Sequence, residues 1–244
     1  MNNSYLFISD IHLGLQDKDT EKKKERLLVN FLEFANSEAK ELFILGDLFD
    51  FWFEYGRVYQ KGFYRTLTAL SDLAEKNIKI HYIIGNHDFL HRDFFGTEFG
   101  AILYQEALDI NLDRKRFFLA HGDGLVKNDM GYKILKKVLR NPLLQKCYSF
   151  IHPDLGIAIA SRTSRSSRDY TSKRSFGEQD GLFETAKQKL EEGYDYVIFG
   201  HSHSRIITAY NNGCYINLGS WLEKPCYGVF NNGLFKIVDL NYNE

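Results

Sequence analysis

The stretch GDLFDFW, residues 46–52, ends an apolar run at residues 42–45 and turns at once to carboxylates and aromatic rings. A short apolar run of this kind is typical of a buried strand in an α/β sheet. Gly46 lets the backbone turn sharply at the strand end, and Asp47 then points to the edge where such sheets bind ligands. We interpret the rings of residues 49–53 as core packing beneath a site, with a pocket wall as the less common alternative.

The same kind of signal recurs after four other apolar runs. The further motifs are DIH at 10–12, GNHD at 85–88, HGD at 121–123 and GHSH at 200–203. One Asp or His after a strand is more often a turn residue than a ligand. Five such turns in one chain predict a shared site at the ends of neighbouring strands.

Composition limits the class of protein. The 244 residues carry a net charge of −1, so no global excess of charge favours nucleic acid or a membrane surface. Three scattered cysteines argue against a disulfide framework and favour a reducing compartment. The N-terminal stretch has no signal-peptide pattern, and no apolar run approaches the ~18–20 residues of a spanning helix. We therefore expect a soluble or peripherally attached protein.

Hydrophobic periodicity gives the expected order of elements. Strands at about 5–8, 42–45 and 78–84 alternate with helices at about 20–39 and 62–76, which predicts parallel pairing through helical crossovers. The charged run at 21–26 is interpreted as the solvated first turns of the first helix. A helix at 178–192 precedes short strands that we expect to form an antiparallel second half. The predicted class is α/β, with two packed sheets covered by helices.

The motifs supply a mixed set of oxygen and imidazole donors without a thiolate. The candidate metal ligands are Asp10, His12, Asp47, Asn86, His121, His201 and His203. Such donors suit Mn²⁺, Fe²⁺ or Zn²⁺. Seven ligands exceed the four of a tetrahedral site and suit two octahedral ions that share a bridging carboxylate and water. Two metals about 3.5–4 Å apart are the usual arrangement for in-line displacement at phosphorus.

The ordered motifs D-x-H, GD-x-x-D, GNHD, HGD and GH-x-H resemble those of the calcineurin-like metallophosphoesterase superfamily. The resemblance implies a single domain over 1–244 with a four-layer α-β-β-α sandwich. It assigns Asp10, His12, Asp47 and His203 to one metal, and Asp47, Asn86, His121 and His201 to the other. It also implies that His87, hydrogen-bonded to Asp88, stabilises the phosphoryl transition state or protonates a leaving oxygen. Asp47, His87 and Asp88 are thus the implied catalytic residues.

An insertion at about 125–176 distinguishes this chain. Between residues 125 and 174 it has eleven Lys or Arg and three Asp, and the basic residues alternate with apolar patches. A basic amphipathic helical lid of this type is one interpretation, with an anionic lipid or an acylated anionic substrate as its ligand. A solvated helical hairpin packed over the core is the other.

The motifs and the insertion together are similar to the UDP-2,3-diacylglucosamine pyrophosphatase family. That resemblance implies Mn²⁺-dependent cleavage of an acylated UDP-sugar to UMP and 2,3-diacylglucosamine 1-phosphate, in lipid A synthesis. His87 stands where well-studied family members have Arg, and Tyr170 where they often have Asn. The implied substrate contacts are Asn86, His87, Asp123, Ser166, Tyr170, Lys173 and His201.

The family resemblance further implies two Mn²⁺ per chain, with Fe, Zn or Mg as substitutes. It places the protein in the cytoplasm, peripheral on the cytoplasmic face of the bacterial inner membrane, with its lid on the inner leaflet. Nucleic acid is not expected as a partner, because the basic residues cluster with apolar ones. Two alternatives stay open: a phosphoesterase for another nucleotide diphosphate conjugate or a phosphoprotein, and a non-catalytic scaffold.

Overall fold

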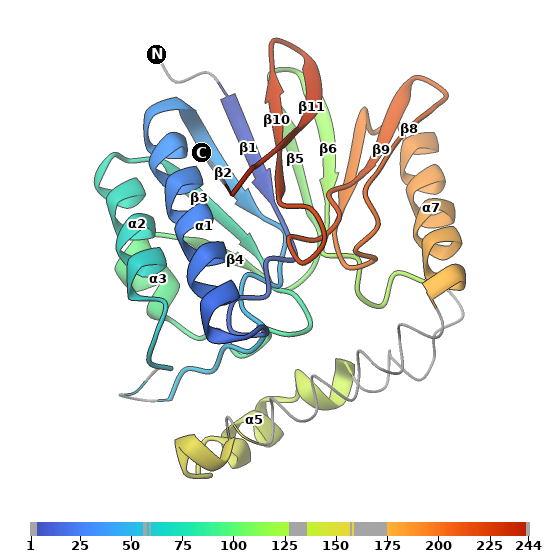
Figure 1. Cartoon of the computed structure of the whole chain (residues 1–244). Coiled ribbons are helices and arrows are strands. Elements are labelled where there is room, and N and C mark those ends of the chain that lie inside the picture. Colours follow the sequence, from blue (N-terminus) through green and yellow to red (C-terminus); the bar gives the residue numbers. More distant parts are fainter. Residues whose placement is uncertain are drawn as a thin grey trace.

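The structure is a computed structural model that describes residues 4–55, 58, 60–126, 136–156, 158 and 175–242, with only the backbone of 175–180. Its helices and strands follow the order predicted for the first half of the chain (Figure 1). The strands are β1 Ser4–Ile8, β2 Ala39–Ile44, β3 Lys79–Ile83, β4 Ile102–Tyr104, β5 Leu108–Leu112, β6 Lys115–Leu119, β7 Tyr196–Phe199, β8 Ile206–Tyr210, β9 Gly213–Asn217, β10 Cys226–Asn231 and β11 Leu234–Asp239. The helices are α1 Lys18–Glu38, α2 Tyr64–Glu75, α3 Phe94–Phe99, α5 Pro142–Tyr148 and α7 Ser175–Glu191.

Two sheets form the centre of the described structure. One has six strands in the order β11-β10-β1-β2-β3-β4, and the other has five in the order β5-β6-β7-β9-β8. The pairs β1–β2, β2–β3 and β3–β4 are parallel. Parallel pairing brings the carboxyl ends of β1, β2 and β3 to one edge, which is where the predicted ligands begin.

The second half of the chain contains the predicted antiparallel pairs β5–β6, β8–β9 and β10–β11, but it also contains two parallel pairs. β6 and β7 are parallel, as are β7 and β9. Because these strands run the same way, the turns after β6 and β7 open at a common edge, and that edge carries HGD and GHSH. The chain then returns to the first sheet, where β10 pairs antiparallel with β1. The prediction did not include the parallel pair of β6 and β7, because a crossover through α7 cannot be told from a hairpin by strand patterns alone.

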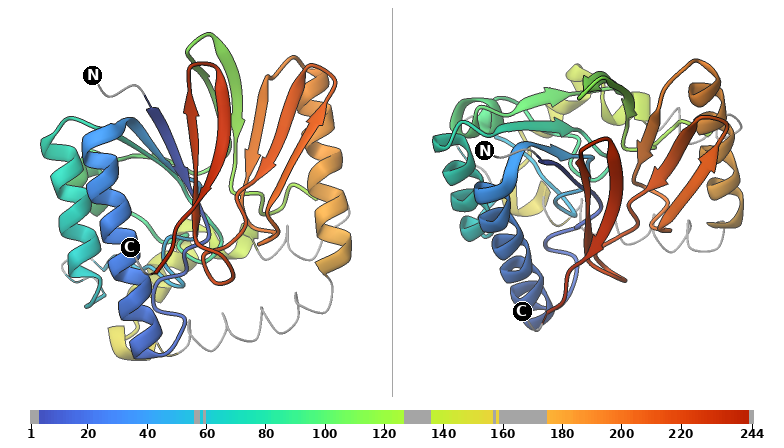
Figure 2. Two further views of the ribbon diagram at one scale, coloured as in Figure 1. Left: turned by 45° about the horizontal axis from the view of Figure 1, so that its top comes forward. Right: turned by 90° about the horizontal axis from the view of Figure 1, so that it is seen from above.

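Helices cover the outer faces of the two sheets, which gives the predicted four layers. Figure 2 shows α1 and α2 outside one sheet and α7 outside the other. Three apolar clusters fill the spaces between layers. Leu28 and Phe31 of α1 pack on the first sheet, Phe7 and Phe117 lie between the sheets, and Ala186 of α7 packs on the second. The rings of Phe49 and Trp52 are fully buried in the first cluster, as expected for core packing.

Helix α1 corrects the interpretation of the charged run at 21–26. Asp17 caps the helix by accepting from the N–H groups of Asp19 and Thr20. Lys22 and Lys23 are exposed, but Lys24 is fully buried. Position 24 lies one turn before Leu28, so it belongs to the face of the helix that packs on the sheet. A charged residue at a buried helical position needs partners, and those of Lys24 lie beside the site.

Only part of the predicted lid falls within the described residues. The short helix α5 is capped by Asn141, which accepts from the N–H groups of Leu143 and Leu144. It lies beyond the carboxyl ends of the strands (Figure 1). Its Tyr148 ring packs 4.9 Å from Phe53, between ring centroids. Within the described part of the chain, none of the helices has the length and apolar character required to cross a bilayer.

Candidate active site

The turns that carry the candidate ligands share an unusual backbone conformation. Asp10, His12, Asp47, His201 and His203 all have positive φ angles, between 49° and 66°. Non-glycine residues seldom adopt this left-handed region, and it costs roughly 1–2 kcal/mol for each of them. Such conformations cluster at functional sites, where the surrounding structure holds them. The turns after β1, β2 and β7, which carry these five residues, are therefore strained in order to place the side chains.

Two glycines allow the turns to approach one another. A Cβ on Gly85 would lie 2.1 Å from the Asp47 carboxylate, and one on Gly200 would lie 2.3 Å from that of Asp10. Both distances are shorter than van der Waals contact. The glycines of GNHD and GHSH are therefore needed for close approach to the carboxylates. Gly46 combines a close approach, because a Cβ there would lie 2.7 Å from Nδ1 of His121, with the positive φ of 84° expected for a turn.

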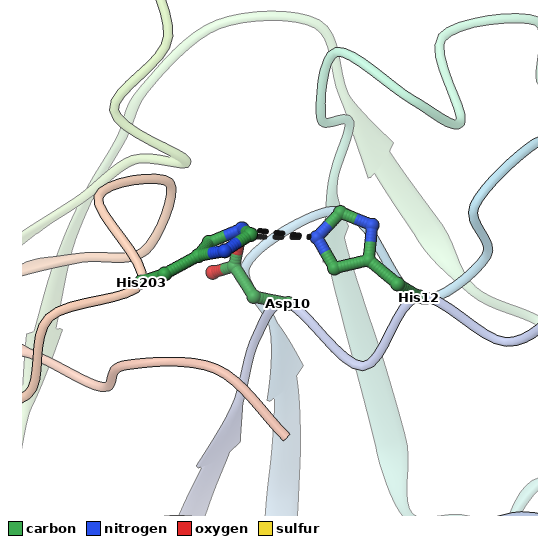
Figure 3. Close-up of side chains that lie close together, drawn as sticks. All are labelled: Asp10, His12 and His203. Atoms are coloured by element: carbon green, nitrogen blue, oxygen red, sulfur yellow. Dashed lines mark hydrogen bonds and ion pairs between the residues drawn. The ribbon is translucent and has the colours of Figure 1, made fainter. Parts of the chain in front are cut away.

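Asp10, His12 and His203 meet on one side of the site (Figure 3). The Nε2 atoms of His12 and His203 are 3.1 Å apart. The Asp10 Oδ1 atom lies 3.4 Å from Nε2 of His203 and 3.8 Å from that of His12. One potential ligand atom from each residue thus points to a common centre. The other oxygen of Asp10 accepts from Ser9 and from the N–H of His201.

Asp47 and His121 form the neighbouring cluster with Asn86. His121 Nδ1 is 2.8 Å from the carbonyl oxygen of Leu45, which can only accept. Nδ1 therefore carries the proton and Nε2 is the ligand atom. That Nε2 lies 2.9 Å from Oδ1 of Asn86 and 3.3 Å from Oδ2 of Asp47. The same Asp47 oxygen is 3.7 Å from His12 Nε2, so it stands between the two clusters.

His201 completes the set from the second sheet. Its ring centroid lies 5.1 Å from that of His121, and its N–H donates to Asp10 over 2.9 Å. The structure thus brings all seven candidate ligands to one place. The first sheet supplies Asp10, His12, Asp47 and Asn86. The second sheet supplies His121, His201 and His203.

The electrostatics of the metal-free site follow from its buried carboxylates. Burial opposes charge on His12, but Asp10 and Asp50 outweigh it and raise its pKa to about 9. Burial likewise opposes charge on His121, yet Asp47 and Asp10 raise its pKa to about 10. Burial and the charge of His121 lower the pKa of His201 to about 4. Two buried carboxylates are thus balanced by protons on two histidines.

The donor set fits divalent metal ions. Among the described residues, Oδ1 of Asp10 is buried without a hydrogen-bond partner. A buried carboxylate oxygen in that state is costly unless a cation faces it. Imidazole and carboxylate donors with one amide oxygen suit Mn²⁺, Fe²⁺ or Zn²⁺. Metal ions at the centres of the two clusters would take the place of the protons on His12 and His121.

His87 and Asp88 have different surroundings from those expected. The Asp88 carboxylate is fully buried and accepts from the N–H groups of Leu48 and Gly85 and from the hydroxyl of Tyr82. It braces the turns after β2 and β3. The His87 ring contacts Asp50 instead, with Nδ1 3.2 Å from its carbonyl oxygen and 3.6 Å from its carboxylate.

Asp50 is the site residue to which sequence reasoning gave no role. It lies within the aromatic stretch 49–53, which drew attention to the rings. Its Oδ1 atom is 3.7 Å from Nδ1 of His12, and it is buried. The spacing GD-x-x-D could have indicated a role for Asp50, because a turn of four residues can bring its carboxylate close to that of Asp47. Asp50 therefore orients both His12 and His87.

Asp123, expected to contact substrate, is buried and paired with cations from the insertion. Its Oδ2 lies 2.9 Å from Nζ of Lys136 and 3.6 Å from Nη2 of Arg140. Arg140 also donates to the carbonyl oxygens of Gln105 and Ile84. This ionic cluster, Asp123 with Lys136 and Arg140, anchors the start of the described insertion beside the site. Ser166, Tyr170 and Lys173 lie outside the described residues.

Comparison with known proteins agrees with this geometry. A family model described as calcineurin-like phosphoesterase matches residues 4–205. The UDP-2,3-diacylglucosamine hydrolase of Porphyromonas gingivalis is 32% identical over 248 residues, which cover 94% of this chain and 95% of that protein. The enzyme of the same name from Haemophilus influenzae is 30% identical, with 91% of each chain covered.

Solved structures show the same fold at lower similarity. An archaeal phosphodiesterase superposes with a TM-score of 0.50 at 15% identity, and the match covers 97% of this chain and 99% of that one. At this identity the likeness concerns the fold alone. The two-sheet sandwich of this chain therefore has the same fold as that solved structure.

Proposed function

This chain belongs to the calcineurin-like phosphoesterase family, and from that premise we propose that it hydrolyses the pyrophosphate bond of UDP-2,3-diacylglucosamine. The products would be UMP and 2,3-diacylglucosamine 1-phosphate. The observation that carries the proposal is the similarity to hydrolases of that name over 94% of the chain. A match of that extent includes the insertion as well as the motifs. The oxygen and imidazole cluster at the strand ends supplies the chemistry that such a reaction needs.

We infer that the seven candidate ligands hold two divalent ions, with Mn²⁺ as the preferred metal. One ion would be bound by Asp10, His12, Asp47 and His203, and the other by Asp47, Asn86, His121 and His201. Bound there, the ions supply Lewis-acid stabilisation of the phosphoryl oxygens and a water of lowered pKa. The shared position of the Asp47 carboxylate, within 3.7 Å of His12 and 3.3 Å of His121, supports its assignment as the bridge.

In the proposed reaction the oxygen of water bonds to phosphorus as the anhydride P–O bond breaks. The displaced phosphate leaves with the bonding electrons, and the proton lost by the attacking water passes to the solvent. Nδ1 of His87 donates to the carbonyl oxygen of Asp50. A hydrogen bond from His87 to the phosphoryl group would therefore come from Nε2 of the imidazolium, in which both ring nitrogens carry a proton. Asp50 thus fixes the orientation of His87, and Asp88 fixes the turn that carries it. His87 takes the position of an arginine in related enzymes and supplies a donor of shorter reach.

The test is release of UMP from UDP-2,3-diacylglucosamine by the purified protein with Mn²⁺. We expect one UMP for each lipid product, and a product that retains one phosphate. UDP-glucose, which has the same anhydride without acyl chains, is the matched control and should react far more slowly. If the protein hydrolysed a generic aryl phosphodiester but released no UMP from UDP-2,3-diacylglucosamine, the proposed substrate would be wrong. The phosphoesterase activity itself would still be supported.

His87 supports one second candidate, a phosphoesterase for another nucleotide diphosphate conjugate. A histidine is shorter than arginine, and when Nδ1 is occupied it offers the phosphate a single N–H, at Nε2, and only as the imidazolium. A substrate with a smaller group beyond the pyrophosphate could approach it more closely. Faster turnover of UDP-glucose than of the diacylated substrate would favour this candidate.

We further propose that the described part of the insertion contacts an anionic bilayer. Five large apolar side chains of this part are exposed, with the Phe150 side chain at 80% and Leu143 at 69%. Basic residues accompany them, including Lys137 and Lys146. An apolar surface of this kind beside Lys side chains favours the interface of anionic lipids. The ionic cluster and the contact between Tyr148 and Phe53 attach this part of the insertion to the rest of the protein.

Changing Leu143 and Phe150 together to serine is expected to weaken binding to phosphatidylglycerol vesicles by about tenfold or more. Burying one such side chain contributes roughly 1.5–3 kcal/mol when complete. Co-sedimentation with vesicles measures the effect. The matched control replaces Ile207 and Leu234, which are exposed on β8 and β11, together by serine. That variant should bind the vesicles as the unchanged protein does. Equal loss in both variants would contradict a role for the insertion.

A further inference from the structure

A buried ion pair lies at the start of α1, next to the site. The Lys24 side chain has no exposed surface, and its Nζ lies 2.8 Å from Oε1 of Glu21. The Glu21 side chain is 15% exposed. The two residues are one helical turn apart, so they face the same side of α1. The pair also contacts the loop that carries His12.

Both residues of the pair also contact the loop between β1 and α1. Lys24 Nζ donates to the carbonyl oxygen of His12 over 2.8 Å. Glu21 accepts from the N–H of Gly14 over 2.8 Å and from that of Gln16 over 2.7 Å. One charged pair therefore satisfies three backbone groups within five residues. It grips the loop on both sides of Leu13.

This loop carries His12 in a strained conformation. His12 has a φ of 49° and Gly14 one of 95°. The His12 ring packs edge-on against those of His87 and His203, with centroids 4.9 and 5.0 Å away. A small rotation of the loop would move the Nε2 atom away from Asp10 and Asp47. The loop needs a restraint from outside, because the left-handed conformation is not favourable by itself.

Stability alone is a weak reason for the ion pair. A buried pair loses hydration, and apolar residues of similar volume are often as stabilising or more so. Position 24 faces the apolar surface that Leu28 and Phe31 share, where leucine or methionine would fit the helix pattern. What an apolar residue cannot do is donate to the His12 carbonyl oxygen. The contact between Nζ and that oxygen is therefore the specific feature of this position.

We propose that Lys24, held by Glu21, is a positioning residue that sets the imidazole of His12 for the metal shared with Asp10 and His203. This inference rests on the two-metal site proposed above and adds a determinant outside the seven ligands. Removing the contact should weaken that one metal position. The position formed by Asn86, His121 and His201 should keep its affinity, because its ligands come from other turns.

The test compares Lys24→Met with Lys22→Met in the full chain. Lys22 lies on the same helix, and its side chain is 53% exposed and forms a surface ion pair with Asp19. Supporting groups of metal ligands typically change metal affinity by about 10–100-fold. We expect Lys24→Met to bind one Mn²⁺ as before and the second about 10–100-fold more weakly. Lys22→Met should bind both as the unchanged protein does.

Calorimetric titration with Mn²⁺ gives the two affinities, and electron paramagnetic resonance distinguishes a spin-coupled pair from a single ion. Glu21→Gln provides a second variant with nearly the same shape, in which the weaker position is expected to lose affinity in the same direction. Two unchanged affinities in both variants would overturn the inference alone. Fewer than two Mn²⁺ in the unchanged protein would overturn the two-metal proposal, and with it this inference.

Discussion

Replacing Asp47 by alanine is expected to reduce the rate of phosphodiester hydrolysis on the order of 10³-fold or more. The carboxylate lies between His12 and His121, at 3.7 and 3.3 Å from their Nε2 atoms. Its other oxygen accepts from the N–H of His87 over 2.9 Å. The substitution therefore removes a ligand shared by both metal positions and a support of the turn that carries His87.

The measurement combines steady-state kinetics with the Mn²⁺ content of the purified protein. Asp47→Ala should retain fewer than two Mn²⁺ ions per chain. Its activity should fall together with the Mn²⁺ content. Asp19→Ala is the matched control, because that side chain is 89% exposed on the first turn of α1. It should leave both quantities unchanged. An Asp47→Ala protein with more than a tenth of the normal rate would show that the two-metal arrangement is not required.

Removing the metals is expected to destabilise the protein strongly, and to change how its stability depends on pH. An ion at 100 times its dissociation constant contributes about 2.7 kcal/mol to stability. Two such ions would raise the melting temperature by roughly 10–20 °C for a chain of this length. Chelation should reverse that rise, and added Mn²⁺ should restore it. Thermal unfolding with and without a chelator measures the difference.

The direction of the pH dependence follows from His12 and His121. In the metal-free protein their pKa values are raised to about 9 and about 10, above the ordinary 6.5. A raised pKa contributes stability that is fully present below pH 6.5 and is lost as the pH rises through the folded-state value. The metal-free protein should therefore become less stable between pH 7 and 9.5. Metal must displace those protons, so its affinity should rise over the same interval.

Measuring melting temperatures at pH 7, 8.5 and 9.5 separates the two effects. The gap between the metal-bound and the chelated protein should widen with pH. His121→Gln, which removes one of the two titrating groups, should flatten the change in the chelated protein. If the chelated protein gained stability as the pH rose, the two histidines would not hold the protons assigned to them.

The sequence was most informative where strand ends carry chemistry. Parallel strands in an α/β sheet end at one edge, so the motifs after β1, β2 and β3 could be placed together without any structure. The alternation of apolar runs and helical patterns gave the first half of the fold for the same reason. The resemblance to a family with ordered motifs supplied the grouping into two metal positions. Local patterns were therefore sufficient for the residues that act at the strand ends.

Residues that act through tertiary contacts were less accessible. Lys24 stands in a run of six charged residues, and composition outweighed the helical period that puts it one turn before Leu28. Asp88 belongs to a motif, yet its role as a brace depends on Tyr82, six residues away on β3. The parallel pairing of β6 with β7 depends on a crossover of more than 70 residues. Such relations are set by packing between distant segments, which periodicity does not encode.

The return of the chain to its first sheet has a consequence for synthesis in the cell. β1 is made first, but its neighbour β10 comes more than 200 residues later, paired through Tyr5 with Phe230. At about 5–20 residues per second, this delay is roughly 10–45 s on the ribosome. During that time one edge of β1 has unpaired backbone groups that invite other strands. Asp10 also waits for Ser220 and Trp221, whose side-chain hydroxyl and backbone N–H bind its carbonyl oxygen. The nascent chain is thus exposed to aggregation, and a chaperone that covers open strand edges would protect it until the sheet closes.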